Sequence, residues 1–154
     1  MTRLGVFNRG LARVPTLAAL LGASVVRCWW WPHGELHGTL GWGTRWFGGR
    51  ARQVALARRV PFTCLEDGFL RSFGTGDRFP PLSLVVDATG IYYDSTRPSD
   101  LERLLVSDED LLAGGILNDV AQARALIAGN GLSKYNHAPP LAQVQAAMGN
   151  PLLR

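Results

Sequence analysis

Residues 62–76 read FTCLEDGFLRSFGTG, and this stretch decides the expected fold. Its first five residues are mostly apolar, β-branched or aromatic, which is typical of a short buried strand. Asp67 and Gly68 then release the chain into a loop that reaches Pro81. Loops of this length in compact domains are usually functional or disordered, so we expect function at the end of this strand.

Strands and helices alternate around this stretch. On its N-terminal side, the patterns predict strands at 4–7 and 24–31 and a glycine-rich turn in GTLGWG at 38–43. They also predict a helix at 11–21 that ends at Gly22 and a helix at 44–59 that ends before Pro61. On its C-terminal side, the patterns predict a hairpin of strands 83–87 and 90–94. A capping box from Ser99 to Glu102 opens a helix through Leu105. Two more helices are predicted, one that starts at Ser107 and one at 118–128 that ends at Gly129.

This order predicts an α/β fold, namely a Rossmann-like, mainly parallel sheet with flanking helices. Ligands of such sheets bind beyond the carboxyl ends of the strands. Glu66 ends the 62–66 run and Asp67 follows it, so we expect both at the functional edge.

The composition indicates one globular domain with an uneven charge. The chain has 154 residues, of which 47% are hydrophobic and 18% charged, and this excludes a disordered chain. Residues 1–59 hold nine arginines and one acidic residue, Glu35. Such a basic half suggests a polyanionic partner, whether nucleic acid, anionic sugar or lipid headgroup, although a genome bias toward arginine explains the excess equally well. No nucleic-acid-binding motif accompanies the charge, so we expect no nucleic-acid partner.

The cysteines and histidines give no sign of a metal site. Cys28 and Cys64 stand singly in apolar runs and are predicted to be buried. His33 and His37 are four residues apart, but they lie in a glycine-containing segment that is a poor helix. We therefore expect neither a disulfide nor bound zinc.

No stretch reaches the roughly 18 apolar residues that span a bilayer. Residues 14–26 resemble the apolar part of a signal peptide, but Pro15 interrupts them and Arg27 follows. A soluble, cytoplasmic chain is the expectation.

Asp67 and Glu66 are the strongest candidates for chemistry. Neighbouring residues of a strand point to opposite faces, so only one carboxylate faces a given cleft and the other is free to position it. A carboxylate at a strand end can act as nucleophile or general base. Arg71 is spaced to pair with Asp67 or with an anionic ligand, and Ser72 begins a stretch whose backbone N–H groups suit an anion. The alternative is a structural Asp-Gly turn with an Arg–carboxylate ion pair.

Other candidates lie outside this stretch. The indole of Trp42 could stack on a sugar ring while Gly43 lets the ligand approach the backbone. The alternative is a packed turn in which Trp42 is a core residue. Tyr92 and Tyr93 are expected on opposite faces of a strand that Asp94 ends, although a strand and a capped helix explain this segment as well. Lys134 and Asn136 are suited to phosphate or sugar hydroxyls.

These segments together resemble the capsular polysaccharide β-Kdo transferases of the KpsC type, also called LipA. The resemblance rests on WG at 42–43, LEDGFLRS at 65–72, PLSLVVD at 81–87, GIYYDSTRPSDLE at 90–102 and LSKYN at 132–136, in matching order and spacing. It covers about residues 1–137.

The resemblance implies a retaining glycosyltransferase built of GT-B-like pairs of Rossmann lobes. Its donor would be CMP-Kdo, and its acceptor a lipid-linked sugar in capsule biosynthesis, without a cofactor or a metal needed for binding. It implies Asp67 as the catalytic carboxylate, with Glu66 in support. The substrate-binding residues would be Trp42, Gly43, Gly68, Arg71, Ser72, Tyr93, Asp94, Lys134 and Asn136.

The chain departs from the family after residue 137, because it has no His-Pro motif of the second lobe. We therefore expect residues 1–137 to be the first Rossmann-like lobe, and 138–154 a divergent tail derived from truncation. The expected partners are the acceptor, the missing second lobe or capsule assembly proteins, and the inner membrane as a peripheral contact. The alternatives are a non-catalytic fragment that binds acceptor or membrane, and a remnant without function.

Overall fold

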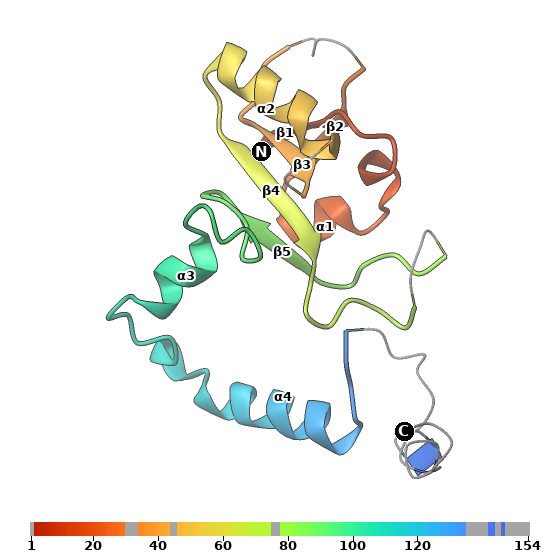
Figure 1. Cartoon of the computed structure of the whole chain (residues 1–154), viewed down its shortest axis with the longest axis vertical. Coiled ribbons are helices and arrows are strands. Elements are labelled where there is room, and N and C mark those ends of the chain that lie inside the picture. The colour runs from red at the N-terminus through yellow and green to blue at the C-terminus, as the bar shows by residue number, and fades with distance from the viewer. Residues whose placement is uncertain are drawn as a thin grey trace.

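The chain folds around one five-stranded sheet (Figure 1). The structure, a computed structural model, describes residues 2–29, 34–43, 46–74 and 78–134, together with 142, 143 and 146. The strands are β1 (Arg3–Val6), β2 (Ser24–Arg27), β3 (Gly38–Trp42), β4 (Phe62–Asp67) and β5 (Leu84–Asp87). Their order in the sheet is β2-β1-β3-β4-β5; the first four are parallel and β5 runs antiparallel to β4. The predicted mainly parallel α/β fold is confirmed.

Helices cover both faces of the sheet. The described helices are the 3-10 helices η1 (Leu11–Arg13) and η2 (Ala113–Gly115), and α1 (Leu17–Leu21), α2 (Trp46–Arg58), α3 (Asp100–Leu105) and α4 (Leu117–Gly129), of which η1, α1 and α2 contact the sheet. Leu40 of β3 packs with Leu11 and Leu17 in the apolar core, whereas its neighbour Thr39 donates a hydrogen bond to the carbonyl of Ala51 in α2 at 2.9 Å. Since neighbouring strand residues face opposite ways, η1 and α1 cover one face and α2 the other.

The predicted turn at 38–43 is wrong, because GTLGW forms the central strand β3. A Cβ on Gly41 would lie 2.8 Å from Cα of Gly48 in α2 and 2.8 Å from the ring of Phe62. Glycine at this position lets α2 pack directly on the strand. The glycines thus serve close packing between a helix and a strand, rather than a reversal of the chain.

The predicted helix 11–21 is interrupted. It divides into η1 and α1, because Pro15 lacks a backbone N–H and forces the preceding Val14 into an extended conformation with ψ of 108°. Gly22 ends α1 as predicted, with a left-handed φ of 58°. The strand expected at 24–31 ends earlier, at Arg27.

The predicted hairpin of 83–87 and 90–94 is also wrong. β5 pairs with β4, with Asp67 opposite Leu84, so the long loop after β4 makes the reversal. Residues 91–94 form turns instead of a strand, which means that Tyr92 and Tyr93 do not alternate across a sheet. The carboxylate of Asp87 stabilises the preceding turn at 87–90, accepting from the backbone N–H groups of Thr89 at 2.9 Å and Gly90 at 2.6 Å.

The capping box is confirmed, but the helix expected from Ser107 is absent. The hydroxyl of Ser99 accepts from the backbone N–H of Glu102 at 3.1 Å, and the Glu102 carboxylate accepts from the backbone N–H of Ser99 at 2.8 Å. Ser107 donates its hydroxyl back to the carbonyl of Leu104 at 2.8 Å, so it closes α3 and caps no following helix. The helix predicted at 118–128 is α4, which ends at Gly129 as expected.

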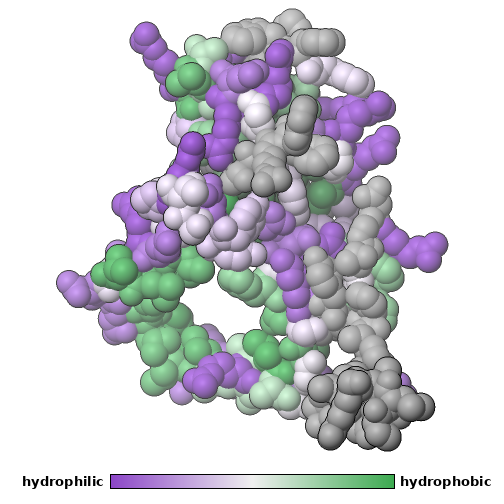
Figure 2. All heavy atoms as spheres, viewed as in Figure 1, coloured by the Kyte–Doolittle hydropathy of each residue, from purple (hydrophilic) through white to green (hydrophobic). Residues whose placement is uncertain are grey.

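Helices α3 and α4 extend away from the sheet as an arm (Figure 1). Hydrophobic residues gather along this arm and line a hollow between it and the sheet (Figure 2). They include Leu104, Leu105, Leu111, Leu112, Ile116, Leu117 and Leu126. Within the described parts of the chain, no helix is long and apolar enough to cross a membrane.

Both cysteines are buried and free, as predicted. Burial is the main cause that raises the pKa of the Cys64 thiol, to about 11. The thiol is therefore protonated at neutral pH and acts as a small apolar side chain.

Candidate functional site

The carboxyl ends of β1, β3 and β4 meet at one edge of the sheet. Asn8 follows β1, Trp42 ends β3, and Glu66 and Asp67 end β4. A cavity of about 290 Å³ opens here. It is lined by Asn8, Gly10, Leu11, Val14, Trp42, Arg71 and Pro81. The structure thus brings the predicted residues Trp42 and Arg71 together at the edge where parallel sheets bind ligands.

Arg71 organises the loop after β4. Its side chain is 10% exposed, and its Nε donates to Oδ1 of Asp67 at 2.5 Å. Its Nη1 donates to the Ser72 hydroxyl at 2.8 Å and to the carbonyls of Gly74 at 2.9 Å and Phe79 at 2.7 Å. Of the two pairings left open by the sequence, the ion pair with Asp67 is the one formed. It joins the strand end to the far side of the loop.

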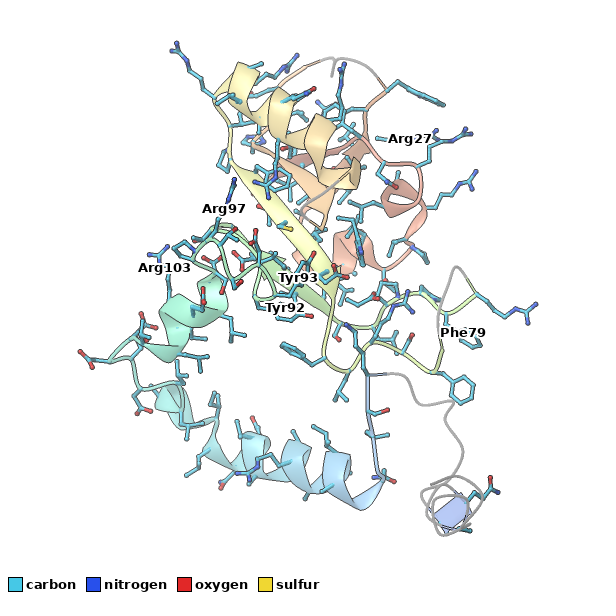
Figure 3. The ribbon with its side chains drawn as sticks, in the orientation of Figure 1. Arg27, Phe79, Tyr92, Tyr93, Arg97 and Arg103 are labelled. Carbon is cyan, nitrogen blue, oxygen red and sulfur yellow. The ribbon has the colours of Figure 1, made fainter. Side chains whose placement is uncertain are left out.

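Glu66 has different partners from its neighbour Asp67, as expected for adjacent strand residues. Its Oε2 accepts from the hydroxyl of Tyr93 at 3.3 Å, and its Oε1 from the backbone N–H of Asp67 at 3.0 Å. A Cβ on Gly43, where φ is +63°, would lie 3.2 Å from that hydroxyl and 3.8 Å from Oε2 of Glu66. Gly43, Glu66 and Tyr93 therefore form one cluster, with Tyr93 half exposed at the loop surface (Figure 3).

Gly68 and Lys134 contact the same loop through their backbones. Ser83 occupies the place that a Cβ on Gly68 would need, and the backbone N–H of Gly68 donates to the carbonyl of Ser83 at 3.1 Å. The backbone N–H of Arg71 donates to the carbonyl of Lys134 at 3.1 Å, so the chain after α4 returns to the loop. Asn136 lies outside the described residues.

Asp94 directly follows Tyr93, but its carboxylate is hydrogen-bonded within its own turn. Its Oδ1 accepts from the backbone N–H of Thr96 at 3.1 Å and from the Thr96 hydroxyl at 2.6 Å. These hydrogen bonds are the main cause that holds the pKa of Asp94 below its ordinary value. Asp94 lines a separate cavity with Arg52 and Arg97.

Sequence reasoning missed two residues. Asn8 lines the first cavity, and its Oδ1 accepts from the backbone N–H of Leu11, the first residue of η1, at 3.0 Å. A polar residue directly after the first strand was a usable signal for it. Arg52 lines the second cavity, and its place depends on a contact with Phe62 that no local pattern reveals. The described part of the chain holds no group of three or more side chains placed to bind a metal.

A mostly parallel sheet with a carboxylate pair and a cavity at its carboxyl edge defines an α/β protein of the Rossmann-like class. The family model described as "Capsule polysaccharide biosynthesis protein" matches residues 38–150. The chain belongs to this family.

Relatives in two organisms are similar to this chain in sequence. The chain is 42% and 43% identical, over 137 residues and 88% of its length, to the capsule polysaccharide modification proteins LipA of Neisseria meningitidis serogroups A and B. It is 41% identical over 87 residues, 56% of its length, to the lipopolysaccharide-processing protein LpsZ of Rhizobium meliloti. The chain spans about a fifth of the length of these relatives, covering 19% of each LipA and 20% of LpsZ.

A solved structure shares the fold. The KpsC protein of Thermosulfurimonas dismutans, described as a beta Kdo 2,4 transferase, superposes with a TM-score of 0.77 at 44% sequence identity. The match covers 90% of this chain and 43% of that chain. The resemblance to the KpsC and LipA proteins is confirmed.

Proposed function

We propose that this chain supplies the acceptor-side lobe of a retaining glycosyltransferase in capsule polysaccharide biosynthesis. The lobe would take part in transferring β-Kdo from CMP-Kdo to a lipid-linked sugar acceptor. The likeness to a Kdo transferase supports the reaction class. The observation that carries the proposal is the carboxylate pair at the end of β4, tied through Arg71 to the cavity that Trp42 lines.

In this proposal Asp67 is the nucleophile. Its carboxylate attacks the anomeric carbon of the donor sugar, and the bond from that carbon to the phosphate oxygen breaks, so that CMP leaves with the electron pair. An acceptor hydroxyl then attacks the same carbon, and the bond to Asp67 breaks. Two successive inversions retain the configuration, as in retaining glycosidases. Arg71 orients the Asp67 carboxylate through its Nε.

Glu66 is suited to receive the proton of the acceptor hydroxyl. Glu66 and Asp67 face opposite sides at the carboxyl end of β4, so in this proposal the acceptor lies across the strand end, with its hydroxyl near Glu66 and the donor sugar at Asp67. The Tyr93 hydroxyl at 3.3 Å orients Oε2 of Glu66, and the lack of a side chain at Gly43 makes room for that hydroxyl. The indole of Trp42 offers a face for a sugar ring, and Ser72 and Lys134 help to fix the loop around the acceptor.

The test is a transfer assay with CMP-Kdo carrying a radiolabel in the sugar and a synthetic lipid-linked Kdo acceptor. The chain is assayed alone and with the remaining part of the T. dismutans KpsC module supplied as a separate polypeptide, with and without EDTA. We expect label in the lipid when both parts are present, at the same rate in EDTA. Absence of transfer by the pair, when the intact relative is active, would contradict the proposed function.

A basic, aromatic patch supports a peripheral contact with anionic lipid. We define it as Arg9, Arg27 and Trp29. The Trp29 side chain is 66% exposed, and the guanidinium carbons of Arg27 and Arg9 lie 4.1 Å and 5.6 Å from its ring centroid. Arg27 ends β2 and Arg9 follows β1, and both strands run parallel to β3 and β4, so the patch lies at the same carboxyl edge of the sheet as Asp67. Tryptophan and arginine are the residues that interfaces with anionic lipids favour.

Vesicle binding tests this patch. The chain is expected to sediment with phosphatidylglycerol-containing vesicles and not with pure phosphatidylcholine vesicles, and salt should weaken the binding. Arg27→Gln should lower the partition constant about fivefold, since each arginine near such a surface contributes about 1 kcal/mol. Trp29→Ala should weaken it as well, whereas Arg124→Gln, an exposed arginine of α4, should bind like the wild type. An equal decrease of the partition constant in the Arg124→Gln variant would mean that the patch has no special role in vesicle binding.

A further inference from the structure

A second cavity lies between α2, which contributes Arg52, and the loop that joins β5 to α3. Arg97, labelled in Figure 3, belongs to this loop. The volume of the cavity is about 250 Å³, and it is lined by Arg52, Thr89, Gly90, Asp94, Thr96 and Arg97. It shares none of these residues with the cavity at Trp42 and Arg71. We propose that it binds an oxyanion, a carboxylate or phosphate group, between the guanidinium groups of Arg52 and Arg97. This anion site does not depend on the proposed transferase function, and its binding is measured without a sugar donor.

Arg52 is held in place with part of its hydrogen-bonding capacity unmet. Its guanidinium carbon lies 4.1 Å from the centroid of the Phe62 ring, and this stacking uses the flat face of the group. Its Nε is buried, and it is the one buried side-chain nitrogen or oxygen without a hydrogen-bond partner within the described ranges. Buried donors are nearly always paired, so this unpaired N–H is an exception that a nearby acceptor would relieve.

Arg97 provides the second cation. It is exposed, and across the described parts of the chain its guanidinium forms no ion pair. The backbone N–H of Arg97 donates to the carbonyl of Asp94 at 3.3 Å, which fixes the turn that carries the side chain. The planar fork of a guanidinium matches the two oxygens of a carboxylate or phosphate.

Asp94 does not neutralise this pair. Its Oδ1 is already engaged by two hydrogen bonds from Thr96. The charges of Arg97 and Arg52 both lower the pKa of Asp94, so both guanidinium groups are near it, yet neither forms an ion pair with it. Among the side chains that line the cavity, two are cationic and one is anionic, while the carboxylates of Asp87 and Asp100 and the guanidinium of Arg103 lie behind this lining.

The hydroxyls of the cavity offer little to a neutral ligand. The Thr89 hydroxyl is engaged with the carboxylate of Asp100 and accepts from Nη1 of Arg103 at 3.2 Å, and the Thr96 hydroxyl donates to Asp94. The N–H of Gly90 donates to Asp87. Recognition thus depends on the two arginines, which select charge and planar geometry rather than sugar hydroxyls.

The test is a titration of the full, isotope-labelled chain, followed by NMR of the Arg52 Nε–H and of the Gly90 and Thr96 amides. Inorganic phosphate and acetate are added separately, against sodium chloride at the same ionic strength. We expect saturable shifts at these three groups with phosphate or acetate and none with chloride. The anion with the lower Kd identifies whether a phosphate or a carboxylate is preferred.

Variants separate a built site from general charge attraction. Arg97→Gln changes an exposed residue, so it is expected to fold like the wild type and to weaken binding about tenfold or more, since charge-assisted bidentate pairs are strong. Arg52→Gln should weaken it similarly, and Arg124→Gln should leave the Kd unchanged. Shifts that chloride reproduces, or a Kd that Arg97→Gln does not alter, would overturn the proposal.

Discussion

Replacement of Asp67 by asparagine is expected to lower the rate of Kdo transfer by roughly 10³-fold or more, because loss of a covalent nucleophile is among the most severe changes an active site undergoes. The amide oxygen of asparagine can still accept the hydrogen bond that Arg71 Nε donates to Oδ1. The fold of the loop should therefore survive while the nucleophile is lost. The measurement is the initial rate of label incorporation in the reconstituted transfer assay.

Two variants serve as controls for this loss. Asp108→Asn removes a carboxylate from an exposed position after α3 and should leave the rate unchanged. Glu66→Gln should slow transfer less than Asp67→Asn, since water can take the proton of the acceptor. Transfer by Asp67→Asn within tenfold of the wild-type rate would exclude Asp67 as the nucleophile and would favour the reading of its ion pair as purely structural.

Replacement of Arg71 by methionine is expected to destabilise the chain by about 3 kcal/mol, because removing one partner of a buried ion pair leaves the other charge uncompensated. The change leaves Asp67 without this ion pair, and it also removes the donors to Ser72, Gly74 and Phe79. Methionine keeps most of the length of the side chain, so the decrease in stability comes from lost hydrogen bonds more than from lost packing. The measurement is the midpoint of urea unfolding at unchanged slope.

The matched variant is Arg124→Met on the exposed side of α4, which should change stability by less than about 0.5 kcal/mol. Arg71→Lys should recover only part of the loss, because an ammonium group lacks the planar fork that reaches four partners. An Arg71→Met variant as stable as Arg124→Met would show that the loop is held by other contacts.

The sequence was sufficient for β4 and its carboxylates. An apolar run that ends in two acidic residues and a glycine has one simple explanation in an α/β chain, and the structure confirms the strand and its parallel pairing with β3. The capping box at Ser99 was equally readable, because each of its hydrogen bonds is local. Features that depend on neighbouring residues alone were predicted well.

Features that depend on tertiary contacts were not predicted correctly from the sequence. Gly41 and Gly38 appeared to mark a turn, since the tight packing of α2 against β3 that requires a small residue at 41 is invisible in the local pattern. The hairpin after β5 was predicted because Thr89-Gly90 suits a turn. The partner of β5 is instead β4, reached across the long loop. Arg52 gave no signal, as its stacking on Phe62 joins a helix to a strand.

In the candidate site, too, local contacts were predictable from the sequence and contacts between distant residues were not. The spacing of Asp67 and Arg71 allowed an ion pair or an anion site, and the structure shows the ion pair. The contact between Glu66 and Tyr93 joins residues 27 apart, and no spacing rule predicts it. The role of Gly43 beside that contact follows only once Tyr93 is placed in a turn rather than in a strand.

The most direct measurement is mass spectrometry of the tryptic peptide that spans residues 60–71, taken from reconstituted transferase quenched in acid during turnover of CMP-Kdo. This peptide contains both carboxylates, and fragmentation assigns a modification to one of them. The predicted result is one Kdo residue attached to Asp67, which disappears when acceptor is added in excess before the quench. A modification on Glu66 or on another peptide, or turnover with Asp67 never modified, would contradict the role of Asp67 as the nucleophile of a retaining Kdo transferase.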